Sequence, residues 1–417
     1  MRGRARSQRP VTPADDLAAR GWQVDGGMVL SDGSALTDLV GQSNLPLYLY
    51  NRRILRHRVG ALREAFPAWV PCYAVKANPH RAIVSTLYES GCSLEVSSEG
   101  EFRIASAVAS GPRIGVVGPG KTRALVEAAI DGNAGWLAAE SERDLQLIAA
   151  SLASRRARSV PLVRVNMRHK VTGAGETMAG QPSQFGIDEE AVASVIARVT
   201  SAPIAGLHLY AGSQFLDTEA IVNATAALFQ TFWTLESAVG LDWEHLVCGL
   251  GIGVTPSLAA CPAVEPKQLH SRLMRALGGD LAALESSSRV LELDVGRYLV
   301  ADAGLLVTRV LDVKCSRGRT FVVVDSGMHS FLRPMTPWGE QHAVSVLGRA
   351  TDEPTGVVTV VGPACLPGDV LATDVALPPV TTDDLLLVHS VGAYGLSMSP
   401  LGWGSFGATR ELMVDDG

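Results

Sequence analysis

Short apolar runs alternate with amphipathic segments of helical periodicity from Pro46 onward, over about 240 residues. The apolar runs are bounded by Gly, Pro or Asn, which is typical of parallel βα units. The runs are residues 69–75, 93–97, 114–117, 135–138, 160–165, 204–210 and 245–248. The helical segments are residues 52–66, 81–89, 99–109, 123–131, 142–153, 189–198 and 218–238. Roughly eight such units are what a closed (β/α)8 barrel requires, so the pattern predicts that barrel, with an open doubly wound sheet as the alternative.

The pattern changes to β-rich segments after residue 288. These segments are residues 290–293, 303–314, 320–325, 356–361 and 385–388, and turn residues separate them. They predict an antiparallel β domain, to which the strand-turn-strand pattern of residues 26–36 would add an early strand. We therefore divide the chain into a polar N-terminal arm (1–20), early strands (21–45), a barrel (46–288) and a C-terminal β domain (289–417).

Composition excludes several classes of partner. Of the 417 residues 47% are hydrophobic, and the net charge is -6 with no long basic stretch, which argues against a nucleic-acid partner. The six cysteines show neither a CxxC pair nor zinc-ligand spacing, so we expect free thiols in a reducing compartment and no metal site. No apolar signal core follows the arginines of residues 1–9, and no window approaches the ~18 apolar residues of a membrane span. We expect a cytoplasmic protein that does not contact a membrane.

Lys76 is the first residue that points to chemistry. It ends an apolar strand in Pro71-Cys-Tyr-Ala-Val-Lys-Ala-Asn-Pro79, immediately before an Asn-Pro stop. A barrel presents its catalytic groups at such strand ends, and buried lysines are rare without a partner or a function. The alternative is a lysine whose ammonium group reaches solvent from the strand end.

Two glycine-containing motifs follow later barrel strands. In the first, residues 206–214, His208 and Tyr210 alternate onto one face before Gly212 and Ser213, whose N–H groups and hydroxyl suit an anion. The second, residues 248–253, reads Cys-Gly-Leu-Gly-Ile-Gly and could wrap a phosphate closely. Glycines at this spacing also occur in many ordinary tight turns.

Further polar residues occur at a strand end and in C-terminal loops. Asp294 and Arg297 flank a glycine, an arrangement that an ordinary surface ion pair would also produce. Cys365 stands between prolines and Tyr394 follows Gly392-Ala393, both in expected loops, where functional groups concentrate. A buried structural thiol is the alternative for Cys365.

Taken in order, these motifs resemble those of the fold type III pyridoxal-phosphate decarboxylases, the group that contains diaminopimelate and ornithine decarboxylases. The resemblance runs from about Pro46 to Val414. It rests on Tyr73-Ala-Val-Lys-Ala-Asn78, His208-x-Tyr-x-Gly-Ser-Gln214, Asp294-x-Gly-Arg297, Gly362-Pro-x-Cys365 and Gly392-Ala-Tyr394. It implies a TIM (β/α)8 barrel of the alanine racemase type with a C-terminal antiparallel β domain, and pyridoxal 5′-phosphate as cofactor.

The resemblance also assigns residue roles. Lys76 would form the Schiff base with the cofactor aldehyde, and Asp294 would keep the ring nitrogen protonated. Cys365 would reach in from the second subunit of a homodimer with shared active sites and protonate the carbanion. Arg333 would meet a substrate carboxylate, with an interface ion pair as its alternative. The other cofactor-binding positions are Glu95 and Arg164 near the ring, Tyr210 on the ring face, and Gly212, Ser213, Gly251, Gly253, Arg297 and Tyr394 at the phosphate.

Within the family, four segments look closest to a secondary-metabolism branch, similar to the butirosin-type decarboxylase of a carrier-bound glutamyl group and to exosortase-associated relatives. They are Gly118-Pro-Gly-Lys121, Pro182-Ser-Gln-Phe-Gly-Ile-Asp188, Gly327-Met-His329 and Ser399-Pro-Leu401. The chain departs from the diaminopimelate pattern at five places. These are Tyr210 for the ring-stacking histidine, Asp294 for glutamate, Leu250 for a glycine, Leu366 for an acidic residue, and Pro337-Trp338 near the place of a tyrosine.

The resemblance therefore implies decarboxylation of the α-carboxylate of an amino acid, either free or tethered to a carrier protein, in secondary metabolism. Diaminopimelate decarboxylation in lysine biosynthesis is one alternative. A racemase-like enzyme is another, although it would need a tyrosine where Cys365 stands. A cofactor-binding protein without catalysis is the third, and retention of both Lys76 and Cys365 argues against it.

Overall fold

The computed structural model describes residues 11–31, 33–41, 45–155, 157–199, 203–257, 263–335 and 341–415. The chain forms two compact units. We call Leu55–Val254 with Val264–Ala301 the barrel unit, and Met1–Ile54 with Thr255–Ala263 and Asp302–Gly417 the β unit. Within the described ranges, no helix has both the length and the apolar composition needed to cross a bilayer.

Eight parallel strands close into a barrel, with each strand beside the next in the chain and the last beside the first. They are β5 (Val70–Ala74), β6 (Ser93–Val96), β7 (Ile114–Val116), β8 (Trp136–Ala139), β9 (Val160–Asn166), β12 (Gly206–Tyr210), β14 (His245–Gly249) and β15 (Val290–Val295). Nearly every strand residue is buried, because one face lines the barrel interior and the other packs under helices. The closed barrel is confirmed over the open sheet.

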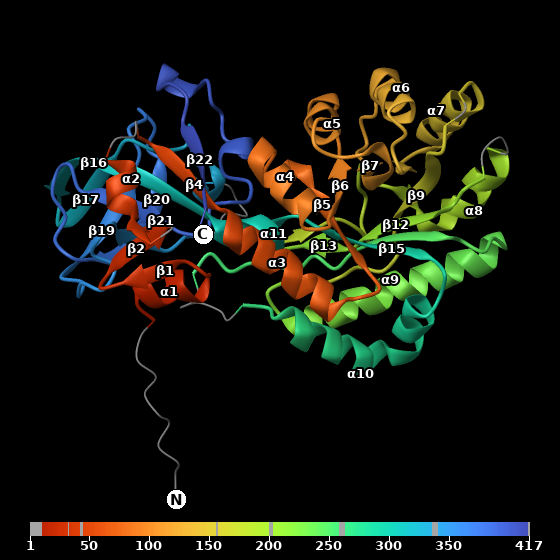
Figure 1. Cartoon of the computed structure of the whole chain (residues 1–417), viewed down its shortest axis with the longest axis horizontal. Helices are drawn as coiled ribbons and strands as arrows, with labels where there is room; N and C mark the ends of the chain where they lie inside the picture. The colour runs from red at the N-terminus through yellow and green to blue at the C-terminus, as the bar shows by residue number, and fades with distance from the viewer. Residues whose placement is uncertain are drawn as a thin grey trace, which may run out of the picture. The chain divides into compact units, whose positions relative to one another are not determined.

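A helix follows each barrel strand. The helices are α4 (Arg81–Glu89), α5 (Glu99–Ser106), α6 (Arg123–Asp131), α7 (Glu142–Ala153), α8 (Glu189–Arg198), α9 (Thr218–Val239), α10 (Pro266–Glu285) and the short α11 (Arg297–Val300), while α3 (Arg52–Ala65) precedes β5. Ser98, Thr122 and Ser141 cap α5, α6 and α7 by accepting backbone N–H bonds. Helices α5, α6 and α7 lie on one side of the barrel strands, and α9 and α10 on the opposite side (Figure 1). Because all barrel strand pairs are parallel, the carboxyl ends of the strands lie at one end of the barrel.

Two strands lie in a different sheet from the one predicted. The segment at 290–293, expected in the β domain, belongs to β15, which pairs with β14 and β5. This assignment was wrong because only the short α11 follows β15, so the βα alternation is not visible there. Conversely β4 (Leu47–Asn51), which falls within the predicted barrel range, pairs with β16 (Gly304–Ser316) of the β unit.

The β unit contains a larger sheet with the order β18-β21-β16-β17-β19-β20, to which β4 and β22 add. Its further strands are β17 (Arg319–Val324), β18 (Val344–Val346), β19 (Gly356–Val361), β20 (Val370–Leu377), β21 (Leu385–Val388) and β22 (Arg410–Val414). Most pairs are antiparallel as predicted, but β17–β19 and β22–β4 are parallel, so this sheet is mixed. The early strands β1 (Gln23–Asp25), β2 (Met28–Ser31) and β3 (Ser34–Ala35) pair with one another, and α2 (Leu36–Val40) follows them.

The predicted N-terminal arm is ordered where the structure describes it. Residues 1–10 lie outside the described residues, and α1 (Pro13–Ala19) begins with a capping box. The Arg20 side chain behind it is 1% exposed, and its Nε lies 2.7 Å from the Asp16 carboxylate. Arg20 also pairs with Asp302, and Nδ1 of His389 lies 2.9 Å from Asp16. The arm prediction was wrong here because these polar residues form a buried ion network within the β unit, which no local pattern reveals.

Candidate active site

Lys76 lies at the carboxyl end of β5, in a single 3-10 turn, η1 (Val75–Ala77). Its side chain is exposed, whereas the residues on either side of it are buried. The Tyr73 hydroxyl donates to the Asn78 carbonyl oxygen at 2.9 Å and closes the turn. The chain thereby presents the lysine at the barrel end where catalytic groups gather.

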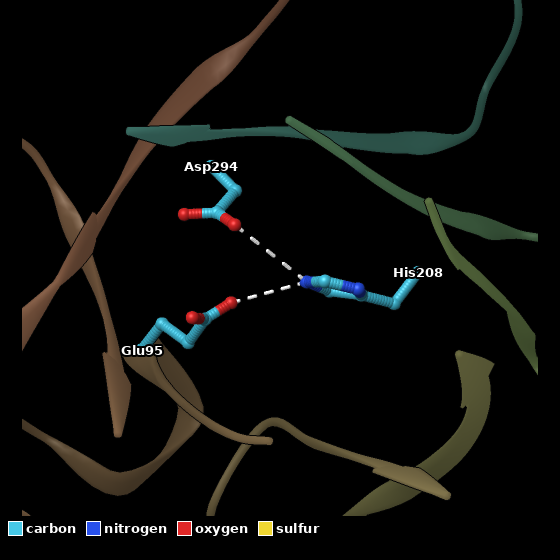
Figure 2. Close-up of side chains that lie close together, drawn as sticks. All are labelled: Glu95, His208 and Asp294. Atoms are coloured by element: carbon cyan, nitrogen blue, oxygen red, sulfur yellow. Dashed lines mark hydrogen bonds and ion pairs between the residues drawn. The ribbon is translucent and has the colours of Figure 1, made fainter. Parts of the chain in front are cut away.

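Three buried side chains from separate strands meet inside the barrel: Glu95 of β6, His208 of β12 and Asp294 of β15. Nε2 of His208 lies 3.1 Å from Oε2 of Glu95 and 3.8 Å from Oδ2 of Asp294. Figure 2 shows the imidazole edge pointing toward both carboxylates. His208 was not assigned a role from the sequence, and its alternation with Tyr210 was the only signal that could have found it.

The three groups titrate differently although burial acts on each. Burial and then the charge of Glu95 raise the pKa of Asp294 to about 8. Burial opposes the ionisation of Glu95, but the hydrogen bond from His208 and the charges of Lys76 and Arg164 outweigh it, so the pKa of Glu95 lies below its usual range. Burial lowers the pKa of His208, and the imidazole is neutral near pH 7. A cationic ligand atom beside Asp294 would restore its ionised form.

The same three groups have ligand atoms within 4.8 Å of one another, a spacing that a metal ion also accepts. The positive charges of Lys76 and Arg164 act on Glu95 and Asp294, and they repel a divalent metal ion at this place more strongly than a group with a single positive charge. The cluster therefore suits an organic cation that hydrogen-bonds one carboxylate better than it suits a metal.

Arg164 approaches from β9 and is held by Glu140. Its Nη1 lies 3.3 Å from Oε1 of Glu140, and its guanidinium lies 4.8 Å from the ring centre of Phe185. The Glu140 carboxylate also accepts hydrogen bonds from the backbone N–H groups of Gly118 at 2.6 Å and Gly186 at 3.1 Å. Glu140 thus ties two loops and Arg164 together. The sequence did not indicate Glu140, because a single acid after an apolar strand forms no motif.

Tyr210 packs directly on the backbone of the neighbouring strand. The sheet register pairs it with Gly249 of β14. A Cβ atom at position 249 would lie 2.0 Å from Cδ2 of Tyr210, so the aromatic ring occupies the space that a side chain would need. Its contact with a cofactor ring stays a prediction.

The glycines predicted to bind phosphate lie in two turns that touch each other. Gly212 and Ser213 form β13, while Gly251 and Gly253 follow β14. A Cβ on Gly251, whose φ is +64°, would lie 2.1 Å from the Gly212 carbonyl oxygen, so only glycine permits this approach. The Phe215 N–H donates to the Gly251 carbonyl at 3.0 Å and locks the two turns together. Such a cradle of small residues lets backbone N–H groups reach an anion.

Arg297 lies beside this cradle. It begins α11 and is 6% exposed, and its Nη2 is 3.6 Å from Oε1 of Glu176. Glu176 starts β10 (Glu176–Thr177), which pairs with β13 through Ser213. A buried guanidinium next to glycine turns is an arrangement that binds phosphate. An amine at Lys76, an acid at Asp294 and this cradle together fit pyridoxal phosphate.

Cys365 belongs to the β unit. The thiol is exposed in the loop between β19 and β20, so the alternative of a buried structural cysteine is wrong. The Asp369 carboxylate accepts hydrogen bonds from the Ala364 N–H at 2.8 Å and the Met328 N–H at 2.7 Å. Asp369 thereby fastens the loop of Cys365 to a second loop, a role that sequence reasoning missed.

The other predicted residues of the β unit are Tyr394 and Arg333. Tyr394 follows β21 with a φ of +54° and is half-buried. Arg333 begins the 3-10 helix η4 (Arg333–Met335). Pro337 and Trp338 lie outside the described residues, as does Cys261, and the five described cysteines are all free thiols.

Comparison with known proteins assigns this architecture to one family. The family model described as "Pyridoxal-dependent decarboxylase, pyridoxal binding domain" matches residues 52–301. Diaminopimelate decarboxylase of Aquifex aeolicus (strain VF5) is 30% identical, covering 89% of this chain and 87% of its own. L-glutamyl-[BtrI acyl-carrier protein] decarboxylase of Niallia circulans is 29% identical over 89% of each chain. The crystal structure of diaminopimelate decarboxylase from Helicobacter pylori complexed with L-lysine superposes with a TM-score of 0.80, at 27% identity over 92% of this chain and 94% of that one.

Proposed function

Because the chain belongs to the pyridoxal-dependent decarboxylases, we propose that it removes the α-carboxylate of an amino acid, with Lys76 binding the cofactor. The observation that carries the proposal is the end of β5, where Lys76 lies close enough to act electrostatically on two buried carboxylates. When bound, the cofactor supplies an electron-accepting ring that takes up the electron pair left as CO2 departs.

Each of the predicted site residues then has a defined role. Lys76 holds the cofactor aldehyde, which needs an amine able to lose its proton. Asp294 carries the counter-charge for the ring nitrogen, and its raised pKa falls when that cation is present. Tyr210 packs against the ring, with Glu95 and Arg164 near its edge. The proposed phosphate ligands are Gly212, Ser213, Gly251, Gly253, Arg297 and Tyr394.

The test of the site is covalent labelling. Borohydride reduction of the cofactor-loaded protein should abolish its visible absorbance and fix the cofactor on Lys76, which peptide mapping will locate. The Lys76→Ala variant should take up no label, whereas Lys267→Ala, which removes a lysine 65% exposed on the surface, should label normally. A label on any other lysine would overturn the assignment.

For the substrate, we propose an amino acid whose distal end is neutral or extended, such as a glutamyl group on the phosphopantetheine arm of a carrier protein. Leu366, which is 39% exposed, stands where the diaminopimelate pattern has an acid. Each lost polar contact in a substrate pocket costs about 1–3 kcal/mol. The Niallia circulans relative, named for an L-glutamyl group on an acyl-carrier protein, supports this choice. We also propose a place in secondary metabolism, from the four segments that resemble that branch.

Diaminopimelate is the second candidate, because the Aquifex aeolicus relative at 30% identity bears that name. A CO2-release assay should compare free diaminopimelate, lysine, ornithine, arginine and glutamate with their carrier-linked forms. We expect the carrier-linked glutamyl form to give the highest kcat/KM. Turnover of free diaminopimelate above roughly 10⁴ M⁻¹s⁻¹, the low end of ordinary enzyme efficiency, would establish the second candidate instead.

We further propose a homodimer in which the partner subunit's Cys365 delivers a proton from Sγ to the reacting carbon. The exposed thiol on a fastened loop supports this role. Mixing Lys76→Ala with Cys365→Ala protein under subunit exchange should restore about a quarter of wild-type activity, since half the dimers would hold one intact site. The control is a mixture of Lys76→Ala protein with protein that carries both Lys76→Ala and Cys365→Ala. It should stay inactive, because no subunit then has Lys76. Absence of rescue with verified exchange would refute the shared site.

A further inference from the structure

His208 stands between two buried carboxylates, and only one of them receives its hydrogen bond. Nε2 lies 3.1 Å from Glu95 but 3.8 Å from Asp294, and the longer separation is outside hydrogen-bond range. The ligand atoms of all three groups lie within 4.8 Å of one another. The two carboxylates would otherwise repel each other or share a proton.

The surroundings of the imidazole decide which nitrogen carries its proton. Nδ1 of His208 is buried and has no hydrogen-bond partner among the described residues. A buried N–H without an acceptor is costly, so the proton is on Nε2 and is donated to Glu95. An imidazolium would leave an N–H unpaired at Nδ1, so the ring is neutral. The charged and titratable groups around it are Glu95 on β6, Arg164 on β9, Asp294 on β15, and Glu140 and Lys76 just beyond β8 and β5.

We propose that His208 is a positioning residue that separates the tasks of the two carboxylates: it engages Glu95 and thereby leaves Asp294 as the one carboxylate open to the cofactor's ring nitrogen. This inference rests on the proposed function of Asp294. It extends that function, because Asp294 then depends on a histidine that need not touch the cofactor. Without the Nε2–H donor, Glu95 and Asp294 compete for the same cation, and the ring nitrogen is held less firmly.

The experiment compares two cofactors, pyridoxal 5′-phosphate and its 1-deaza analogue, in which a C–H group replaces the ring nitrogen. Their dissociation constants from cofactor-free protein are measured by fluorescence. His208→Leu should weaken binding of pyridoxal 5′-phosphate about tenfold or more, equal to about 1.4 kcal/mol, and should change binding of the analogue by less than about twofold. His208→Gln, whose amide N–H can still reach Glu95, should stay within about threefold of wild type for both cofactors.

The chain offers a matched control in His245. This histidine also forms a hydrogen bond with a buried carboxylate, because its Nε2 lies 3.0 Å from Oε2 of Glu292. It is the first residue of β14, at the end of the barrel strands opposite to Lys76. His245→Leu should lower stability and leave the ratio of the two dissociation constants unchanged. If His208→Leu fails to fold, His208→Asn replaces it, because the shorter amide cannot reach Glu95.

Equal weakening of both cofactors by the His208 variants, or of neither, would overturn the inference. Equal weakening would show that His208 only supports the shape of the site. Failure of the proposed function gives a different result, because borohydride would then not label Lys76 in the wild-type protein. If borohydride labels Lys76 but the ratio of the two dissociation constants is unchanged in the His208 variants, the proposed role of His208 is rejected and the proposed function of the site stands.

Discussion

Gly249→Ala is the substitution whose effect can be worked most directly from the structure. The added Cβ would lie 2.0 Å from Cδ2 and 2.4 Å from Cε2 of Tyr210. Ordinary carbon contacts lie at about 3.5–4.0 Å, so the ring must withdraw by roughly 1.5 Å or the strands must part. Forced repacking of this kind typically costs about 1–3 kcal/mol. We expect a loss of that size in the free energy of unfolding, and weaker binding of pyridoxal phosphate because Tyr210 is displaced.

Gly60→Ala is the matched control, because it makes the same chemical change with the opposite expected sign. Gly60 lies inside α3, and a Cβ there would meet nothing within 4 Å. Replacing an unhindered helical glycine by alanine should stabilise the protein by about 0.5–1 kcal/mol. Both variants should be measured by urea denaturation followed through tryptophan fluorescence.

A double-mutant cycle isolates the clash. Tyr210→Ala removes the ring, so adding Gly249→Ala to that variant should cost less than it does in wild type, with a coupling of about 1–3 kcal/mol. If Gly249→Ala is as mild as Gly60→Ala, or if the two substitutions at 210 and 249 are additive, then Tyr210 does not depend on the absence of a side chain at 249.

Three further predictions concern buried charges. Arg20→Met should lower the free energy of unfolding by about 3–5 kcal/mol, because it leaves buried carboxylates without their cation. The control Arg123→Met, at a side chain that is 70% exposed, should change the free energy of unfolding by less than about 0.5 kcal/mol. Urea denaturation measures both. Burial alone would raise the pKa of Asp16, but hydrogen bonds and charges from His389 and Arg20 hold it well below its usual range. The contribution of the ionised Asp16 carboxylate to the free energy of unfolding is therefore fully present above about pH 4 and is lost as the pH falls. In acid-denaturation curves, Asp16→Asn should make the free energy of unfolding depend less on pH in this range. The pKa of Asp294 is shifted the other way, to about 8, so cofactor-free protein should lose stability as the pH rises from about 4 toward 8. Asp294→Asn should abolish that loss in thermal scans, and an unchanged pH slope would contradict the assignment.

Local sequence patterns were sufficient for most of the barrel. Seven strands, helix α3 and the six helices α4 to α9 were predicted, because each buried strand is a short apolar run and each of these helices shows its own periodicity. The long helix α10 after β14 was not predicted; it is interrupted by non-helical backbone at Leu277 and contains the pair Gly278-Gly279. The eighth strand, β15, was predicted as a strand but was assigned to the C-terminal β domain, because only a short helix follows it. Strand β4 was misplaced because an apolar run does not indicate which sheet it will join.

The candidate site divides in the same way. Motifs drew attention to Lys76 and to the glycine turns, since a strand-end lysine and closely spaced glycines are distinctive within a few residues of chain. Glu140 and Asp369 were missed because each is a single acid whose hydrogen-bond partners come from distant loops. Their importance depends on contacts that no window of sequence contains.

The sequence by itself determined the alternation of strands and helices, the positions of the turns and the family resemblance, because each of these depends on residues close together in the chain. Only the tertiary structure decided that His208 would face Glu95 and Asp294, residues 113 and 86 positions away. Closure of the barrel brings β6, β12 and β15 around one interior and removes their polar groups from water. Their charges then depend on one another, and this mutual dependence exists only in the folded barrel.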